Sequence, residues 1–309
     1  MQQSTQNILL IRPSGFVYNE ETSASNAFQH TSEKSTESIK QKAFDEFEMF
    51  AETLRLKGVN TFIFDDTIYP EKPDAIFPNN WATFHDNGTV ILYPMLAHNR
   101  RNERRTDIID SLKQSFSITN ILDLSFHEKN NTFLEGTGSI VFDHKNKIAY
   151  ASLSPRTDKE LFLWVCKYLN YTPVYFHSYD KTGKEIYHTN VMMCVAEKFA
   201  IVCAESILEN HEREKVVHSL EETGHIIVKI SFEEMMNFAG NMLAIAINNN
   251  KNILALSKTA FDSLTKTQKK EIEKHCELVP LSIHTIETIG GGSTRCMMAE
   301  IFLQPLSIK

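Results

Sequence analysis

Apolar and polar positions in this chain alternate between short β-type runs and longer amphipathic stretches, and the same order recurs along its length. Two β-type runs flank a tight turn, a helical stretch follows, and a third β-type run completes the unit. Alternation with a period of two is typical of strands, whereas apolar residues three and four positions apart are typical of a helix. The pattern therefore predicts an α/β fold built from repeats of the type ββαβ.

Four of these units, the second to the fifth, are continuous in the sequence. The second is expected to contain strands at Trp81–His85, Thr89–Tyr93 and Asn120–Leu124, the hairpin signal Asp86-Asn87-Gly88 and a helix near Glu103–Phe116. The third has Gly138–Phe142, a turn at His144–Asn146, Ile148–Leu153, a helix from Asp158 to about Tyr168, and Pro173–Phe176. The fourth has Val191–Val195, Phe199–Ala204, a helix near Glu212–Glu222, and His225–Ile230. The fifth has Met242–Ile247, a turn at Asn248–Asn252, Ile253–Leu256, a helix near Thr267–Cys276, and Leu278–Ile283.

The first unit is split between the two ends of the chain. Its first strand is expected at Met297–Leu303 and its second at Ile8–Ile11, followed by a long helix within Ser35–Lys57 and the strand Val59–Phe64. Pairing of the two ends would close the units into a ring, and closure removes exposed sheet edges. Because no Pro/Ser/Gly-rich linker interrupts the repeat, we predict one domain over residues 1–309.

Each unit opens with an apolar or aromatic residue, two variable positions and then a small polar residue or Cys, although the last copy is less clean. The fourth positions of this opening pattern are Asn80, Thr137, Asn190, Asn241 and Cys296. Their spacing runs from 51 residues (Asn190 to Asn241) to 57 residues (Asn80 to Thr137), and a period of that size indicates a ring or array of supersecondary units.

Three reactive residues fall within these opening segments: Glu135, His188 and Cys296. A carboxylate, an imidazole and a thiol meeting at one mouth of a ring are the groups that covalent catalysis uses. Cys296 also follows Gly290-Gly291-Gly292-Ser293-Thr294, a flexible stretch that can bring backbone N–H groups close to a ligand. Each residue alone would more often be structural, so their shared register in the repeat is what favours catalysis.

The other cysteines lie among apolar neighbours and are expected to be reduced core residues; they are Cys166, Cys194, Cys203 and Cys276. The triple glycine is not a phosphate-binding loop, because neither a Lys nor a helix follows it. None of the 12 histidines shows metal-ligand spacing with a carboxylate partner. We therefore expect no metal and no cofactor.

Composition narrows the class of partner. A hydrophobic fraction of 42% is enough for a packed core, and a net charge of −7 gives no support for nucleic-acid binding. The N-terminus lacks an apolar signal core, and no run approaches the roughly 18 apolar residues that a membrane span needs. We expect a soluble, cytoplasmic protein that binds a small amino-acid substrate, with a homo-oligomer left open.

With these motifs in place, the chain resembles the guanidino-group-modifying superfamily, which includes arginine deiminase, dimethylarginine dimethylaminohydrolase and glycine amidinotransferase. The resemblance covers essentially the whole chain and rests on Ile76–Trp81, Leu134-Glu135-Gly136, Tyr187-His188-Thr189-Asn190 and Gly290–Cys296. Within the superfamily, Arg12-Pro13, Ser23–Gln29 and Phe77–Trp81 resemble the branch of citrulline utilisation hydrolases. The resemblance implies a fivefold pseudosymmetric α/β propeller (pentein) closed by pairing of the termini.

The resemblance also implies residues that bind the amino-acid end of the substrate. Arg156, in Ser154-Pro155-Arg156-Thr157, matches an arginine that binds the substrate α-carboxylate, a task suited to a bidentate guanidinium. One of Arg100, Arg101 or Arg104 is expected to assist, and we select Arg101. Asp65 or Asp66 is the candidate for the α-ammonium group, and we select Asp66.

The chain departs from the arginine-type members at the substrate head group. Those members place a carboxylate where Asn80 stands, often a second at Asn79, and arginine deiminases place one at Asn190. Such carboxylates neutralise a guanidinium cation, and burial of the cation without them is expensive. An uncharged amide that both donates and accepts hydrogen bonds suits a neutral ureido group.

The sequence therefore predicts a cysteine hydrolase acting on the ureido group of L-citrulline or a close analogue. Cys296 attacks the ureido carbon, ammonia leaves, and water releases an N-carboxylated amine that loses CO₂ to give ornithine. His188 protonates the departing ammonia and then deprotonates water, while Glu135 holds a substrate N–H. One alternative has arginine or a methylated arginine as substrate and citrulline as product. The other, a non-catalytic propeller that serves as a binding module, is disfavoured because all three catalytic residues are present.

Overall fold

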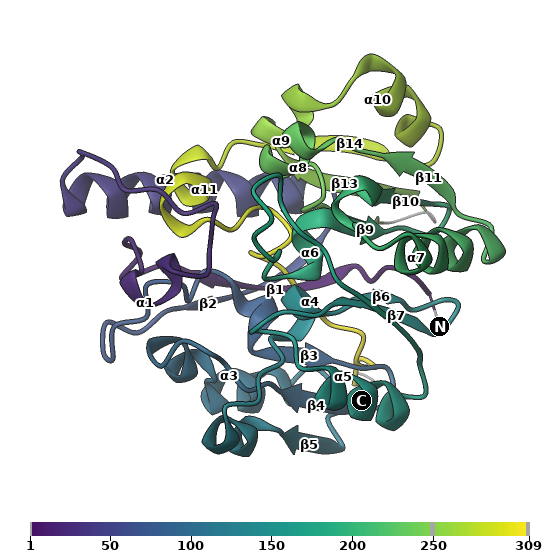
Figure 1. Cartoon of the computed structure of the whole chain (residues 1–309). Helices are drawn as coiled ribbons and strands as arrows, with labels where there is room; N and C mark the ends of the chain where they lie inside the picture. The colour runs from purple at the N-terminus through teal and green to yellow at the C-terminus, as the bar shows by residue number, and fades with distance from the viewer. Residues whose placement is uncertain (1, 248–250, 307–309) are drawn as a thin grey trace.

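The computed structural model of the chain describes residues 2–247 and 251–306. Within these ranges the strands form five three-stranded sheets of one design. In each sheet the first strand pairs antiparallel with the second, and the second pairs parallel with the third. A parallel pair requires a crossover connection, and helices supply it. The fold is therefore mixed α/β with the predicted ββαβ order (Figure 1).

The elements follow the predicted units with shifted boundaries. The first unit comprises β15 (Ala299–Glu300), β1 (Asn7–Arg12), α1 (Glu20–Ser23), α2 (Thr36–Leu56) and β2 (Asn60–Asp65). The second comprises η1 (Pro78–Asn80), β3 (Ala82–Phe84), β4 (Thr89–Leu92), η2 (Asn99–Glu103), α3 (Thr106–Leu112) and β5 (Asn120–Asp123). The third comprises η3 (Ser125–Asn130), α4 (Gly136–Ser139), β6 (Val141–Asp143), β7 (Ile148–Ser152), α5 (Lys159–Leu169) and β8 (Thr172–Phe176).

The remaining two units have the same plan. The fourth comprises α6 (Thr189–Met192), β9 (Met193–Val195), β10 (Phe199–Val202), η4 (Ala204–Ser206), α7 (Asn210–Glu222), β11 (Ile226–Lys229) and α8 (Phe232–Met236). The fifth comprises β12 (Leu243–Ile247), β13 (Lys251–Ser257), α9 (Lys258–Ser263), α10 (Lys266–Glu273), β14 (Glu277–Leu281) and α11 (His284–Gly290). The turn predicted at Asn248–Asn252 lies partly outside the described residues.

The first sheet takes strands from both ends of the chain, as the sequence predicts. β1 pairs with β15 through Leu9 and Ala299 and with β2 along its whole length. β15 is shorter than the predicted run Met297–Leu303, because the chain after Cys296 is still turning: Met298 N donates to Arg295 O at 3.3 Å. First strands of different sheets also face one another, at β15 and β3, β6 and β9, and β9 and β12.

Two predicted strands begin later than expected. Gly138–Phe142 and Val191–Val195 start as the helical turns α4 and α6, and only their last residues enter β6 and β9. In α4 the turn is closed by Gly138 N and Ser139 N, which both donate to Glu135 O. The predicted helix near Glu103–Phe116 is also shorter, because Arg104 leaves the helical region and separates η2 from α3. The helices α1, α8, α9 and α11 were not predicted.

The turn α4 contacts both η1 and α6. Figure 1 shows α4 and α6 in the middle of the molecule, with the sheets around them. Two glycines of α4 permit this approach. A Cβ on Gly136, which has a φ of +46°, would lie 2.3 Å from Asn79 O, and a Cβ on Gly138 would lie 2.3 Å from Asn80 Nδ2. Among the described residues, no helix is both long and apolar enough to cross a membrane.

Candidate active site

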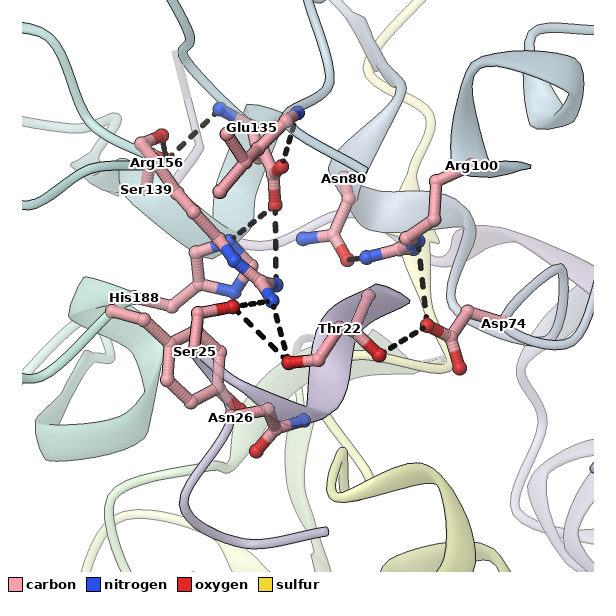
Figure 2. A network of polar contacts seen from close by, with 12 residues as sticks. Thr22, Ser25, Asn26, Asp74, Asn80, Arg100, Glu135, Ser139, Arg156 and His188 are labelled. Atoms are coloured by element: carbon pink, nitrogen blue, oxygen red, sulfur yellow. Dashed lines mark hydrogen bonds and ion pairs between the residues drawn. The ribbon is translucent and has the colours of Figure 1, made fainter. Parts of the chain in front are cut away.

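Two of the three residues predicted to be catalytic stand immediately before central turns, and the third lies in a separate turn. Glu135 precedes α4, His188 precedes α6, and Cys296 lies in the turn after α11. Their exposed fractions are 0%, 3% and 7%, so the site is closed to solvent in this conformation. His188 Nε2 and Glu135 Oε2 are 2.8 Å apart (Figure 2), and Leu96 N donates to the other carboxylate oxygen at 3.0 Å.

Burial and charge fix the protonation of this pair. Burial would raise the pKa of Glu135, but the charge of Arg156 and the hydrogen bond from His188 outweigh it and lower the pKa to about 2. Burial lowers the pKa of His188 to about 4, although Glu135 opposes the shift. Near neutral pH the pair is therefore a carboxylate and a neutral imidazole. The imidazole proton is on Nε2, where Glu135 accepts it, and Nδ1 carries the lone pair of a base.

Two side-chain amides face the sulfur of Cys296. Asn241 Nδ2 lies 3.3 Å and Asn190 Nδ2 lies 3.6 Å from Sγ. Asn241 is held in this orientation because its Oδ1 accepts a hydrogen bond from Arg295 N at 3.0 Å, and its Nδ2 also donates to Asn190 O. Amide donors aimed at the sulfur stabilise negative charge there. Asn241 is a site residue that sequence reasoning identified only as a repeat position.

Arg156 reaches the same centre from the loop after β7. Its guanidinium lies 3.6 Å from Glu135 Oε2 and donates to Ser25 Oγ and to Thr22 O (Figure 2). Its Cζ also lies over the ring of Tyr187, 4.8 Å from the ring centroid. Its Nε is buried and has no hydrogen-bond partner among the described residues. A buried guanidinium with an unused donor is suited to receive a carboxylate.

Asn80 is oriented by Arg100, which lies in η2. Arg100 NH1 donates to Asn80 Oδ1 at 2.9 Å, while its Nε and NH2 form a bidentate pair with Glu103 at 2.9 Å each. Figure 2 shows the Asn80 oxygen turned toward Arg100 and its nitrogen turned toward His188 and Glu135. That nitrogen is buried and has no partner among the described residues. A Cβ at Gly138 would meet both Asn80 Nδ2 and His188 Nδ1 within 2.8 Å, which places these two groups side by side.

The segment that contains α1 lies over the site and contacts Asp74, a residue that the sequence did not single out. Asp74 Oδ2 accepts from Asn19 Nδ2 at 2.7 Å and lies 3.7 Å from Arg100 Nε, whereas Asp74 Oδ1 is buried without a partner among the described residues. Burial raises the pKa of Asp74, and the charge of Arg100 opposes the shift. Asn26 Nδ2 donates to Gly290 O at 3.2 Å, so the same segment also touches the glycine stretch. A carboxylate in the segment Lys72–Phe77 carried no signal in the sequence.

The other residues predicted to bind the substrate are Asn79, Asp66 and Arg101. Asn79 lies beside Asn80, with both side-chain polar atoms buried and unpartnered among the described residues. Asp66 is 3.2 Å from Lys72 Nζ and accepts from Ser14 Oγ. Arg101 donates to Met95 O at 3.0 Å and lies 3.5 Å from Glu128. Within the described part of the chain, no hydrogen bond or ion pair joins Asp66 or Arg101 to Glu135, His188 or Cys296. Across residues 2–247 and 251–306, no group of His, Cys, Asp and Glu is arranged to hold a metal ion.

Comparison with known proteins assigns this chain to a class, the guanidino-group-modifying enzymes. The family model described as N,N dimethylarginine dimethylhydrolase, eukaryotic, matches residues 12–303. The chain therefore belongs to this family, whose members hydrolyse C–N bonds. No curated protein matches the chain in sequence.

Solved structures show the same fold at low identity. The N-terminal domain of ArgZ, a cyanobacterial arginine dihydrolase, bound to its substrate, is 16% identical with a TM-score of 0.73, over 96% of this chain and 99% of that one. AgrE with L-arginine is 14% identical with a TM-score of 0.74, over 96% of this chain and 40% of the longer AgrE chain. A dimethylarginine dimethylaminohydrolase carrying an S-methyl-L-thiocitrulline adduct is 15% identical with a TM-score of 0.63, over 96% and 99%.

Proposed function

We propose that this protein is a cysteine hydrolase that acts on the ureido group of L-citrulline or a close analogue and gives ornithine, ammonia and CO₂. The observation that carries the proposal is the direction of the Asn80 amide. Arginine can only donate hydrogen bonds, so the group that faces Arg100 must be the Asn80 oxygen, and the group that faces the catalytic centre is the N–H₂ donor.

A donor at this position distinguishes the two kinds of head group. A ureido group presents a carbonyl oxygen that can accept from Asn80 Nδ2. A guanidinium presents only N–H groups, and two donors facing each other in a buried site leave both unpaired, which costs about 1–3 kcal/mol. Asn190 supplies the complementary group, because its Nδ2 faces Cys296 and its buried Oδ1 has no partner among the described residues. That oxygen would accept from the ureido NH₂.

The reaction then follows from the protonation of the trio. His188 Nδ1 takes the proton of the Cys296 thiol, and the sulfur adds to the ureido carbon while Asn80 donates to the developing oxyanion. The proton on His188 passes to the departing nitrogen, the C–N bond breaks, and ammonia leaves a thiocarbamate on Cys296. His188 next deprotonates water, which attacks the same carbon. The C–S bond breaks, the sulfur recovers a proton, and the carbamate of ornithine loses CO₂.

The amino-acid end of the substrate is bound in this proposal by charged groups on the other side of the head group. Arg156, with its unused Nε, binds the α-carboxylate. Asp74 Oδ1, buried beside the covering segment, is better supported for the α-ammonium group than Asp66, which already pairs with Lys72. Arg101 and Asp66 remain sequence predictions, as does Asn79 as a contact to the head group.

The ring is also part of the proposal. Pairing of β1 with β15 and contacts between first strands of neighbouring sheets support a single fivefold α/β propeller over residues 1–309. In such a ring the central turns η1, α4 and α6 bring their residues to one mouth.

Hydrolysis of arginine or a methylated arginine is the second candidate. The family description names dimethylarginine, and the fold matches arginine dihydrolases. The test is ammonia release from L-citrulline, L-arginine, dimethylarginine and simple ureido acids, with the amino-acid product identified. The proposal predicts that citrulline has the highest kcat/KM and that ornithine is formed. Faster turnover of arginine or dimethylarginine, with citrulline as the end product, would replace it with the second candidate.

A further inference from the structure

Glu287 is a buried carboxylate next to the nucleophile turn. It lies in α11, its side chain is 2% exposed, and neither of its oxygens contacts the catalytic trio. Oε1 accepts a hydrogen bond from Ser293 Oγ at 2.6 Å, and Oε2 accepts one from Thr259 Oγ1 at 2.6 Å. The hydroxyl of Ser257 is a third hydrogen-bond partner of the carboxylate. All three partners are neutral, and burial raises the pKa of Glu287 above its usual value. Burial of a carboxylate in such surroundings is unfavourable unless its hydrogen bonds are retained.

The bond to Ser293 leads directly to Cys296. Ser293 O accepts from Cys296 N at 3.0 Å, so Ser293 and Cys296 are the two ends of one tight turn. Other anchors hold the flanks of this stretch: Tyr187 OH donates to Gly291 O, and Arg295 N donates to Asn241 Oδ1. The side chain of Glu287 holds the start of the turn itself.

An aromatic ring packs against Gly292, the residue just before the turn. A Cβ on Gly292 would lie 2.8 Å from Phe77, so the stretch is packed against this ring and cannot shift in that direction without a clash. Removing the Ser293 side chain would release the start of the turn from α11, while the hydrogen bond from Arg295 N to Asn241 would remain. A loss of position of even 1 Å at a reacting atom slows the chemical step strongly.

We propose that Glu287 is a positioning residue for the nucleophile, acting through Ser293 to fix the turn that carries Cys296. The proposal rests on Cys296 being the nucleophile of the proposed hydrolase. It assigns no contact with substrate to Glu287, so its removal should affect kcat and the mobility of the turn and leave substrate affinity unchanged.

The chain offers a matched control. Thr259 binds the other oxygen of the same carboxylate but belongs to α9, away from the nucleophile turn. Thr259→Ala therefore removes an equivalent hydrogen bond and leaves Ser293 anchored. Glu287→Gln is the conservative variant, because its amide can accept from Ser293 and donate toward Thr259.

The experiment measures hydrogen exchange of the peptide around Cys296 by mass spectrometry, together with kcat and KM for whichever substrate the wild type hydrolyses fastest. Glu287→Ala and Ser293→Ala should speed exchange at this peptide and lower kcat by about 10- to 100-fold, with KM changed less than about threefold. The double variant should be no slower than the slower single one, because both remove the same bond. Glu287→Gln should recover most of kcat, and Thr259→Ala should stay within about threefold of wild type.

Two results would overturn the proposal. One is Glu287→Ala with wild-type exchange at the Cys296 peptide, and the other is Thr259→Ala with a loss of kcat equal to that of Ser293→Ala, which would indicate general packing. The exchange measurement needs no substrate, so it decides the positioning role separately from the substrate panel, which decides the proposed function.

Discussion

The replacement Asn80→Asp tests the substrate proposal at a single atom. It exchanges the amide nitrogen that faces the catalytic centre for an oxygen and adds one negative charge, while the oxygen that accepts from Arg100 at 2.9 Å can keep its partner. The change is nearly isosteric, which matters because Asn80 is only 3% exposed. The variant therefore alters the hydrogen-bonding character of the site much more than its shape.

The expected size of the effect follows from these contacts. Loss of the donor to a ureido oxygen in a buried site costs about 1–3 kcal/mol, so kcat/KM for citrulline should fall by roughly 5- to 150-fold. For arginine the new carboxylate is favourable, since unit charges about 4 Å apart interact by about 4 kcal/mol at an effective dielectric of 20. Arg100 already offsets most of the added charge. We therefore expect the inhibition constant of arginine to improve by about tenfold, a gain of about 1.4 kcal/mol.

The assay is steady-state ammonia release with citrulline as substrate and arginine as inhibitor, in the wild type, Asn80→Asp and Asn80→Asp with Asn190→Asp. Asn130→Asp is the control, because Asn130 is exposed and the replacement adds the same charge away from the site. The double variant should bind arginine more tightly again. If the wild type already prefers arginine, or if neither variant binds arginine better than Asn130→Asp does, the reasoning about head-group charge is refuted.

Three further predictions concern the other groups of the site. Cys296→Ala should abolish turnover and leave the fold intact, and a substrate adduct should be found on the Cys296 peptide of the wild type. Activity retained in Cys296→Ala but lost in Cys194→Ala would contradict this assignment. Arg156→Ala should lower kcat/KM for citrulline about a hundredfold, because loss of a charge-assisted pair costs about 2–4 kcal/mol. An equal loss for an analogue that lacks the α-carboxylate would show that Arg156 does not bind this group. Burial lowers the pKa of His188 to about 4 in the folded state. Between pH 4 and 6.5 the unfolded state therefore binds more protons than the folded state. The free energy of unfolding should fall by about 3 kcal/mol as the pH is lowered through this window. Urea unfolding of His188→Gln should show a shallower dependence there, and an unchanged slope would refute the assignment.

The strand order was predictable because the repeat imposes it five times. Each sheet needs an antiparallel hairpin and then a crossover helix, and the alternation of apolar residues marks both. The helical turns that precede β6 and β9 were not predictable in this way. Gly136–Ser139 and Thr189–Met192 form single helical turns because the chain must bend at the centre of the molecule, where backbones of different units approach closely. That requirement comes from neighbouring units, and its local traces are glycines. They are Gly136 and Gly138 in α4, and Gly240, where a Cβ would lie 2.2 Å from Val191 O of α6.

The site was predictable to the extent that its residues share the register of the repeat. Glu135, His188 and Cys296 belong to that register, and so does Asn241, which the structure places against the sulfur. Asp74 and the segment around α1 do not belong to it. They reach the site through loops whose lengths differ from unit to unit, and loop positions depend on tertiary contacts that a single sequence does not display. The same limit applies to Arg100, Arg101 and Arg104, which the sequence does not distinguish. The structure shows that Arg100 donates to Asn80, while the role predicted for Arg101 stays a prediction.

The proposed discrimination between a ureido group and a guanidinium depends on Asn80 and Arg100 together more than on either residue alone. An asparagine alone is ambiguous, because its amide can turn and offer a donor or an acceptor at little cost. Arg100 removes that freedom, since a guanidinium has no acceptor, and Glu103 in turn holds the guanidinium by two hydrogen bonds. Replacing Arg100 by a residue that can accept would release the amide, and Asn80 would then no longer discriminate between the two head groups. In the proposed function, selectivity for a neutral substrate therefore depends on a fixed cation beside the amide, because that cation keeps the donor of Asn80 turned toward the head group.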